Sequence, residues 1–167
     1  MSYSALIHAE ATTLIGRGLD AREDEFHGIY HLILTHWFPE NLGYIPAAQV
    51  LGAGGKPEYV VIHRTGHLLG TRNIVLISEL KRPAKWTEAG RREVIDDLVN
   101  YIEGRFDLTQ HDTIYGLGGI GLHWFVCRMR KSGSSWPTVV LDWQDDITSD
   151  GSFAQFGAIA NAVYNIH

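Results

Sequence analysis

A buried strand that ends in two charges is predicted by the stretch Asn73-Ile-Val-Leu-Ile-Ser-Glu-Leu-Lys-Arg-Pro83. The five residues before Glu79 are apolar or small, and Lys81 follows two positions later. Side chains two apart on a strand point to the same face, so this acid and this amine should lie side by side. Charges are rarely held inside a sheet unless they pair or bind a metal. We expect the strand to cover 73–81 and to stop at Pro83, which has no backbone donor.

A second strand with an acid at its start is predicted by Pro57-Glu58-Tyr59-Val60-Val61-Ile62. The two strands together would supply two carboxylates and one lysine. Such a set suits a divalent-metal site for phosphodiester chemistry, because a metal neutralises phosphate charge and lowers the pKa of an attacking water. Carboxylate oxygens favour Mg²⁺ or Mn²⁺. The alternative for Glu79 and Lys81 is a same-face ion pair without a metal.

Pro57-Glu58 followed by Glu79-x-Lys81 resembles the PD-(D/E)xK motif of the restriction-endonuclease-like nuclease superfamily, with Glu58 where that family usually has an aspartate. The run from Glu79 to Trp124 has a looser similarity to small fungal proteins of that superfamily. The resemblance implies an α/β fold with a mixed central β-sheet flanked by helices. It also implies that Glu58, Glu79 and the Leu80 carbonyl bind Mg²⁺ or Mn²⁺. Lys81 would then orient the nucleophilic water or stabilise the transition state.

Two helices are predicted before these strands, over 2–15 and about 21–38. Apolar residues at helical spacing make the second the clearest helix of the chain. Its first turn holds Glu23, Asp24 and Glu25, and acids there complement the helix dipole. Glu23 stands nearest the apolar stripe, and superfamily members often add an acid from this helix to the metal site. Glu23 is therefore a fourth candidate ligand, with helix capping as the alternative, and Glu25 should point further away.

A third helix is predicted over about 87–104, with Thr87 as its N-cap. Asp97 and Tyr101 are four residues apart and should stack on one side of it. This pair resembles the QxxxY element of some exonuclease-type superfamily members, with Asp97 where a glutamine would stand. An ionised aspartate cannot donate a hydrogen bond as glutamine does. The alternative is that both are ordinary helix-face residues.

The remaining segments predict further strands and one helix. Gly116, Gly118 and Gly121 match G-x-G-x-x-G, but a strand-like run follows them instead of the helix that a dinucleotide site needs. We therefore expect a hairpin or bulge at Gly118-Gly119. His63 and His67 are expected at the surface, in or beside a hairpin loop. The other predicted elements are a strand over 44–51, a turn over 52–55, a strand over 138–143 and a helix over 152–165.

Length and composition predict a single domain over 1–167. Cys127, the one cysteine, excludes an internal disulfide and any cysteine-based zinc cluster, and its apolar surroundings predict burial. No signal peptide or membrane span is evident, so we expect an intracellular protein, cytoplasmic or nuclear.

The net charge of −5 argues against a general polyanion binder, yet basic residues cluster within twelve positions beside the predicted site. These residues, together with Tyr101, are candidates for nucleic-acid contacts, and the alternative is a helix start that carries solvated charges. The basic candidates are Lys81, Arg82, Lys85, Arg91 and Arg92.

Two functions follow, and a third has less support. The first is a Mg²⁺-dependent nuclease acting on DNA or RNA, and small nucleases of this kind often act as homodimers. The second is a catalytically inactive relative that keeps the fold as a binding or assembly module, which the net charge and the glutamate at position 58 favour. The third is ligand binding by tryptophans, although tryptophans on strands more often belong to a core. The tryptophans concerned are Trp86, Trp124, Trp136 and Trp143.

Overall fold

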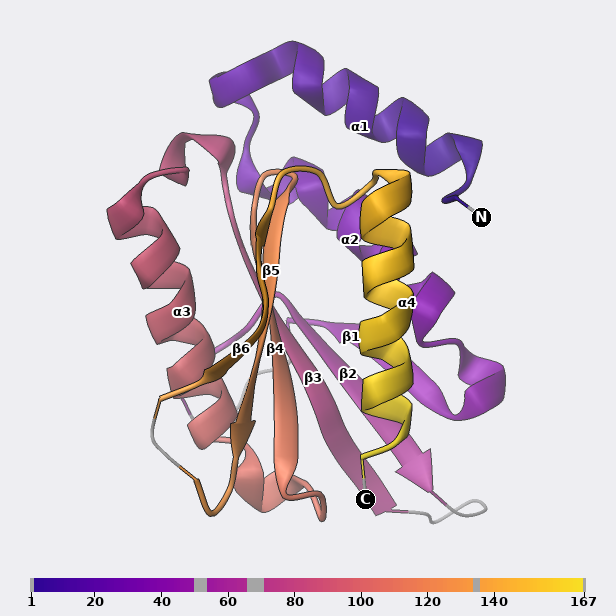
Figure 1. The fold of residues 1–167 in the computed structure, drawn as a ribbon, viewed down its shortest axis with the longest axis vertical. Coiled ribbons are helices and arrows are strands. Elements are labelled where there is room, and N and C mark those ends of the chain that lie inside the picture. Colours follow the sequence, from indigo (N-terminus) through magenta and orange to yellow (C-terminus); the bar gives the residue numbers. More distant parts are fainter. Residues whose placement is uncertain (1, 50–53, 66–70, 134–135, 167) are drawn as a thin grey trace.

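A six-stranded mixed sheet forms the centre of the protein (Figure 1). The computed structural model describes residues 2–49, 54–65, 71–133 and 136–166. The described strands lie side by side in chain order, and among them β3 and β4 are the one parallel pair. They are β1 (Tyr44–Ala48), β2 (Tyr59–Thr65), β3 (Thr71–Lys81), β4 (Thr113–Ile120), β5 (His123–Arg130) and β6 (Thr138–Gln144).

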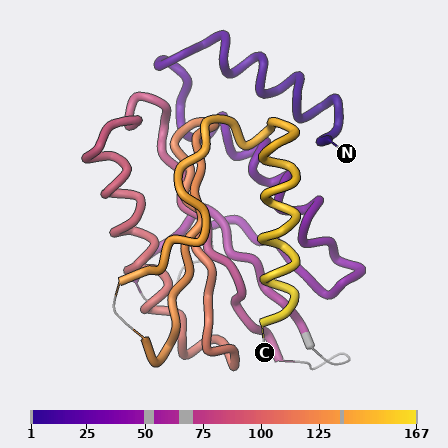
Figure 2. Tube along the Cα trace, viewed as in Figure 1, coloured from indigo at the N-terminus to yellow at the C-terminus, as the bar shows by residue number. Residues whose placement is uncertain are grey.

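Helices cover both faces of the sheet. Helix α3 makes the crossover between the parallel strands and packs on one face, while α2 and α4 pack on the other, with α1 against α2 (Figures 1 and 2). Each face has its own apolar core. The predicted α/β fold with a mixed central sheet flanked by helices is therefore confirmed. The helices are α1 (Ala5–Arg17), α2 (Glu23–Trp37), α3 (Glu88–Glu103) and α4 (Asp150–Tyr164), with short 3₁₀ turns η1 (Gly18–Asp20), η2 (Glu40–Leu42), η3 (Pro83–Lys85) and η4 (Phe106–Leu108).

The elements agree with the sequence expectations to within a few residues at their ends. Thr87 is the N-cap of α3, and its hydroxyl accepts a hydrogen bond from the Gly90 N–H at 3.0 Å. Cys127 is buried, which raises the pKa of its thiol to about 12. The expected turn over 52–55 lies mostly outside the described residues, as do His67 and the end of the strand expected over 44–51. No helix in the described ranges is long and apolar enough to cross a membrane.

The predicted position of the β4–β5 hairpin was wrong. Gly118 and Gly119 lie inside β4, and the chain turns instead at Gly121, whose φ of 61° favours glycine. The two earlier glycines make room for neighbours. A Cβ on Gly119 would lie 2.3 Å from the Tyr30 hydroxyl, and one on Gly118 would lie 2.0 Å from the Phe125 ring. Strand β5 follows the turn directly, so these glycines do not lead into a helix as those of a dinucleotide site do.

Strand β3 extends beyond the start of β2, and this overhang shapes the site. The first paired residue of β2, Tyr59, lies opposite Ser78. The last three residues of β3 therefore have β4 as a partner on one side and no β2 residue on the other. The edge of β3 beyond the start of β2 is therefore open on the β2 side, and we call this gap the opening. If the antiparallel register is continued by one residue, Glu58 faces Glu79 across it.

Candidate active site at the end of β3

Glu79 and Lys81 share the face of β3 that packs against α3. Glu79 is 4% exposed, and its Oε1 accepts a hydrogen bond from Lys81 Nζ at 2.8 Å. Lys81 Nζ also lies 2.8 Å from Oδ2 of Asp97 on α3 and 3.8 Å from Glu93 Oε1. The period-2 pattern thus has the predicted geometric result, and the lysine is held between a carboxylate from the strand and one from the helix.

Burial has opposite effects on the two partners. It raises the pKa of Glu79 to about 7, and the hydrogen bond from Lys81 offsets only part of this rise. For Lys81, burial lowers the pKa, but hydrogen bonds to Asp97 and Glu79 outweigh burial and raise it above its ordinary value. Asp97 therefore keeps Lys81 charged even when Glu79 holds a proton. The second oxygen of Glu79, Oε2, is buried and has no hydrogen-bond partner among the residues that the structure describes.

Glu58 stands at the opening beside β3, directly before β2 begins. Its Oε2 lies 3.0 Å from His27 Nε2 of α2 and accepts a hydrogen bond from the side-chain Nε2 of Gln49 at 3.4 Å. The negative charge of Glu58 contributes to the raised pKa of Glu79, so the two carboxylates are electrostatically coupled.

The Leu80 carbonyl belongs to the same opening. The neighbouring Lys81 carbonyl accepts a hydrogen bond from the Gly121 N–H on the β4 side at 2.9 Å. Successive carbonyls of a strand point to opposite edges. The Leu80 carbonyl therefore points toward the β2 side, where Glu58 stands and where the β2 ladder has ended.

Glu23 is the first residue of α2 and lies at the edge of this group. Burial raises the pKa of its carboxyl group, while Lys81 lowers it and Glu58 raises it, so all three side chains are electrostatic neighbours. The backbone N–H of Arg82 donates to the Glu23 carboxylate. Glu25 has a different role, because it accepts a hydrogen bond from the Arg22 N–H at 2.8 Å and pairs with Arg17. The helix cap is thus Glu25, and Glu23 is turned toward the site.

The basic candidates divide into paired and unpaired side chains. Lys85 binds Glu93 at 2.8 Å, and the Arg91 guanidinium lies over the Trp86 ring at 5.0 Å. Arg82 and Arg92 are exposed and make no ion pair with any described residue. These two side chains are the ones available for phosphate contacts.

Tyr101 lies beside the carboxylates on the α3 side. Burial raises the pKa of its hydroxyl, and the charges of Glu79 and Asp97 add to the rise. The Arg105 guanidinium lies 5.7 Å from the centre of its ring. The phenol is therefore close enough to the site to be influenced by its charges.

Two polar partners of the site, Glu93 and His27, were missed from the sequence, as was the contact between Asp97 and Lys81. A signal for part of this set was present, because positions 93, 97 and 101 are spaced by four and share one side of α3. The stripe faces the strand that α3 crosses. His27 carried no comparable signal.

The residues fit a hard divalent cation in their chemistry but are not gathered around one point. Among the described residues, no three histidine, cysteine, aspartate or glutamate side chains are placed to hold a single ion. The donors available near the opening are nevertheless oxygens of the kind that Mg²⁺ and Mn²⁺ prefer. Glu79 Oε2 is a buried acceptor without a partner, which is the feature a bound cation would satisfy.

Comparison with known proteins identifies a similar fold. No family model matches the sequence, and no curated protein matches it. Among solved structures, the protein is similar to the type IIG restriction endonuclease BpuSI, with a TM-score of 0.59 and 14% sequence identity. The match covers 84% of this chain and 17% of that chain, so this protein spans a small part of its neighbour's length. The protein therefore has a restriction-endonuclease-like fold.

Proposed function

We propose that the protein is a divalent-metal-dependent nuclease that hydrolyses phosphodiester bonds of DNA or RNA. The observation that carries the proposal is the pairing of Glu79 and Lys81 on one buried face at the end of β3, with Glu58 at the adjoining opening. The restriction-endonuclease-like fold supports it. The looser similarity to fungal members stays a prediction from the sequence, as does a homodimer.

The metal would be held by Glu58, Glu79 and the Leu80 carbonyl, with Glu23 as a further ligand. When bound, Mg²⁺ or Mn²⁺ supplies neutralisation of phosphate charge and a lowered pKa for the attacking water. Glu79 can serve two partners at once, because Oε1 keeps Lys81 while Oε2 is available. Glu58 is longer by one methylene than the aspartate usual in such sites, so its carboxylate reaches further into the opening.

Lys81 acts as a fixed positive charge near the reacting phosphate. Two carboxylates, Glu79 and Asp97, each hold the ammonium group at 2.8 Å, so it is oriented before the substrate arrives. A preorganised donor of this kind stabilises charge that develops in the transition state. The phosphates on either side would meet Arg82 and Arg92, which are exposed, and then Lys85 and Arg91.

A second candidate is a nuclease-fold protein without activity, which acts as a binding or assembly module. The same contacts favour it, because Lys81 neutralises Glu79 and His27 pairs with Glu58 in the absence of a cation. In that case the charged groups form a structural network. The two candidates differ in whether the protein cleaves nucleic acid when a divalent cation is supplied.

Calorimetric titration with Mn²⁺ and Mg²⁺ tests the proposal, with cleavage of single- and double-stranded DNA and RNA measured on the same samples. The variants are Glu79→Gln and Lys81→Ala, and Glu10→Gln on the exposed side of α1 is the matched control. We expect metal binding that Glu79→Gln removes and metal-dependent cleavage that Lys81→Ala removes. Binding without cleavage would favour the inactive module, and no binding at millimolar metal would overturn the metal site.

A further inference from the structure

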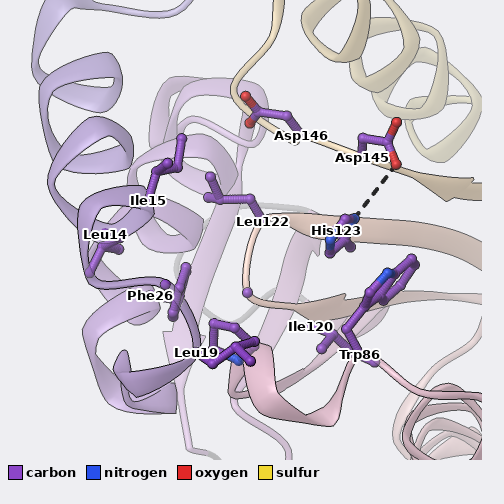
Figure 3. Close-up of a pocket in the computed structure, with 13 residues that line it drawn as sticks. Leu14, Ile15, Leu19, Phe26, Trp86, Ile120, Leu122, His123, Asp145 and Asp146 are labelled. Atoms are coloured by element: carbon purple, nitrogen blue, oxygen red, sulfur yellow. Dashed lines mark ion pairs between the residues drawn. The ribbon is translucent and has the colours of Figure 1, made fainter.

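An apolar pocket of about 320 Å³ lies at the β4–β5 turn, at the end of the sheet (Figure 3). Its walls come from the end of α1, from η1, from the first turn of α2, from the segment after β3 and from the β4–β5 turn. Ile15 and Leu19 are 61% and 70% exposed at its edge. The main apolar side chains are Leu14, Ile15, Leu19, Phe26, Trp86 and Leu122.

The pocket adjoins the backbone that carries the candidate active site. Gly121 of the pocket donates its N–H to the Lys81 carbonyl at 2.9 Å. Pro83 lines the pocket and follows Lys81 by two residues, which is at most about 7.6 Å of chain. Phe26 lines the pocket one turn of α2 after Glu23. A group in the pocket would thus be a near neighbour of a phosphate at Lys81.

The ionisable side chains that line the pocket are two carboxylates and one histidine, namely Asp145, Asp146 and His123. Arg91 does not line the pocket, but its guanidinium lies 5.0 Å from the centre of the Trp86 ring. Asp145 lies 3.7 Å from His123 Nδ1, and Asp146 Oδ1 is fixed by hydrogen bonds from the Thr148 N–H and hydroxyl at 2.8 and 2.7 Å. His123 in turn is stacked on the Trp86 ring at 3.8 Å. Two carboxylates repel a phosphate but accept hydrogen bonds from N–H groups. The cations Arg82 and Lys85, which attract phosphate, belong to the segment that leads away from Lys81.

We propose that this pocket binds one unpaired nucleobase of the strand whose phosphate lies at Lys81. This inference rests on the proposed nuclease function and names its substrate class. The base would cover the exposed Ile15 and Leu19 side chains, which favours binding through burial of apolar surface. Its N–H groups would meet the carboxylates of Asp145 and Asp146. A base enters such a pocket only when it leaves the helical stack, so the substrate is a single strand or an unpaired end.

The charge pattern separates this occupant from others. A phosphate or another anion would be repelled by the two carboxylates. A base that is still paired would not enter either, because the two bases of a pair cannot leave the duplex as one unit. A second copy of the chain is the remaining apolar occupant, and the experiment includes it as an outcome. The proposal requires a base in the pocket and the sugar-phosphate backbone of the same strand beside Arg82 and Lys85, which follow Lys81.

The test measures binding of fluorescein-labelled decanucleotides by anisotropy, with Ca²⁺ in place of Mg²⁺. A fully abasic strand is compared with the same strand carrying one base at its centre, in both DNA and RNA. A strand can shift until its one base reaches the pocket, so the comparison does not depend on register. We expect the single base to tighten binding roughly 5- to 150-fold in the wild-type protein, the range for one base that stacks on an aromatic side chain.

Leu19→Glu places a third carboxylate in the pocket and should remove this gain. Leu42→Glu, at a leucine 52% exposed on η2, carries the same charge change and should keep it. Ile15→Glu is a second pocket variant, and thermal unfolding checks that all three fold. Equal gain in Leu19→Glu and wild type would overturn the proposal. So would a change of oligomeric mass in Leu19→Glu with the gain intact, which would assign the pocket to an interface between copies.

Cleavage of ordinary single strands with Mg²⁺, measured in parallel, separates this proposal from the nuclease proposal. Cleavage without a single-base gain overturns the pocket assignment and leaves the nuclease. A single-base gain without cleavage supports the pocket and rejects the enzyme. No binding of any strand overturns both.

Discussion

The end of β3 has two sides that differ in nearly every physical property. One side holds the carboxylate site, defined as Glu23, Glu58, Glu79, Lys81 and Asp97, where Glu79 is buried, the other four are half-buried, and Lys81 is held by Glu79 and Asp97. On the α1 and α2 side is the apolar pocket, which is open and leaves Leu19 70% exposed. Under the two proposals above, the reaction takes place on the charged side and the base is bound on the apolar side. Substitutions on the two sides should therefore affect different kinetic constants.

The largest effect is expected from Lys81→Ala. Loss of a preorganised charge should reduce kcat of metal-dependent cleavage by roughly 10²–10³-fold. Binding of single strands in Ca²⁺ should change far less, because the pocket is intact. A fall in binding that matches the fall in kcat would break the division between the two sides. Cleavage kinetics in Mg²⁺ and anisotropy in Ca²⁺, measured on the same labelled strand, give the two numbers.

The pH dependence of stability isolates Glu79. Its folded pKa of about 7 lies above the ordinary 4.5, so between these pH values the folded protein keeps a proton that the unfolded chain has lost. The free energy of unfolding of the wild type, relative to Glu79→Gln, should therefore fall by roughly 2–3 kcal/mol as pH rises from 4.5 to 7. Above pH 7 the difference should be level.

Urea unfolding in EDTA across this range measures the difference, and Glu10→Gln is the control because its carboxylate is exposed. A difference that rises with pH would mean that Lys81 stabilises the ionised carboxylate more than burial opposes it. The carboxylate site would then be a stabilising ion pair. It would differ from the pocket in structure, but the difference would no longer indicate a catalytic role.

Asp97→Asn should have a smaller effect on the reaction. Lys81 would keep Glu79 as its one close carboxylate, so we expect kcat to fall roughly 10-fold, within the range for residues that position a functional group. The affinity for Mn²⁺ should also weaken, because Lys81 competes more strongly for Glu79. A purely structural Asp97 would leave metal affinity unchanged. Asp96→Asn, the exposed neighbour on α3, is the matched control.

The smallest effect is expected from Arg92→Ala. One phosphate contact fewer should lower the salt dependence of strand binding by about one counterion. Arg64→Ala, at an exposed arginine on β2, should leave the salt dependence unchanged. Equal effects of the two variants would mean that the cluster beside Lys81 has no special role. Titrations at several salt concentrations give the slope.

Most of the fold could be predicted because the patterns are local. The apolar run before Glu79 and the helical spacing in α2 each depend on neighbouring residues. The misplaced hairpin shows the limit. Glycines at 118 and 119 resemble a turn, but they serve close approach to Tyr30 and Phe125, which belong to other elements. Local patterns do not distinguish a glycine required for a turn from one required for packing.

The site was predictable in the same uneven way. Period-2 geometry placed Glu79 and Lys81 on one face, because both belong to one strand. The contact from Asp97 to Lys81 depends on how α3 crosses back over the sheet. The pocket could not be predicted, because its walls are brought together from separate segments between Leu14 and Asp146. No sequence window contains enough of them to show a pattern.

The strand order has a consequence for how the protein opens and folds. Strands β1–β3 and β4–β6 are two antiparallel meanders, and β3 with β4 is their one parallel seam among the described strands. Each meander can form from near neighbours in sequence, whereas the seam requires closure of the whole α3 crossover. Glu23, Glu58, Glu79 and Lys81 all belong to the first half. We expect amide hydrogen exchange to reveal partial unfolding along this seam. In that state Asp97 separates from Lys81, while the three glutamates of the first half stay together.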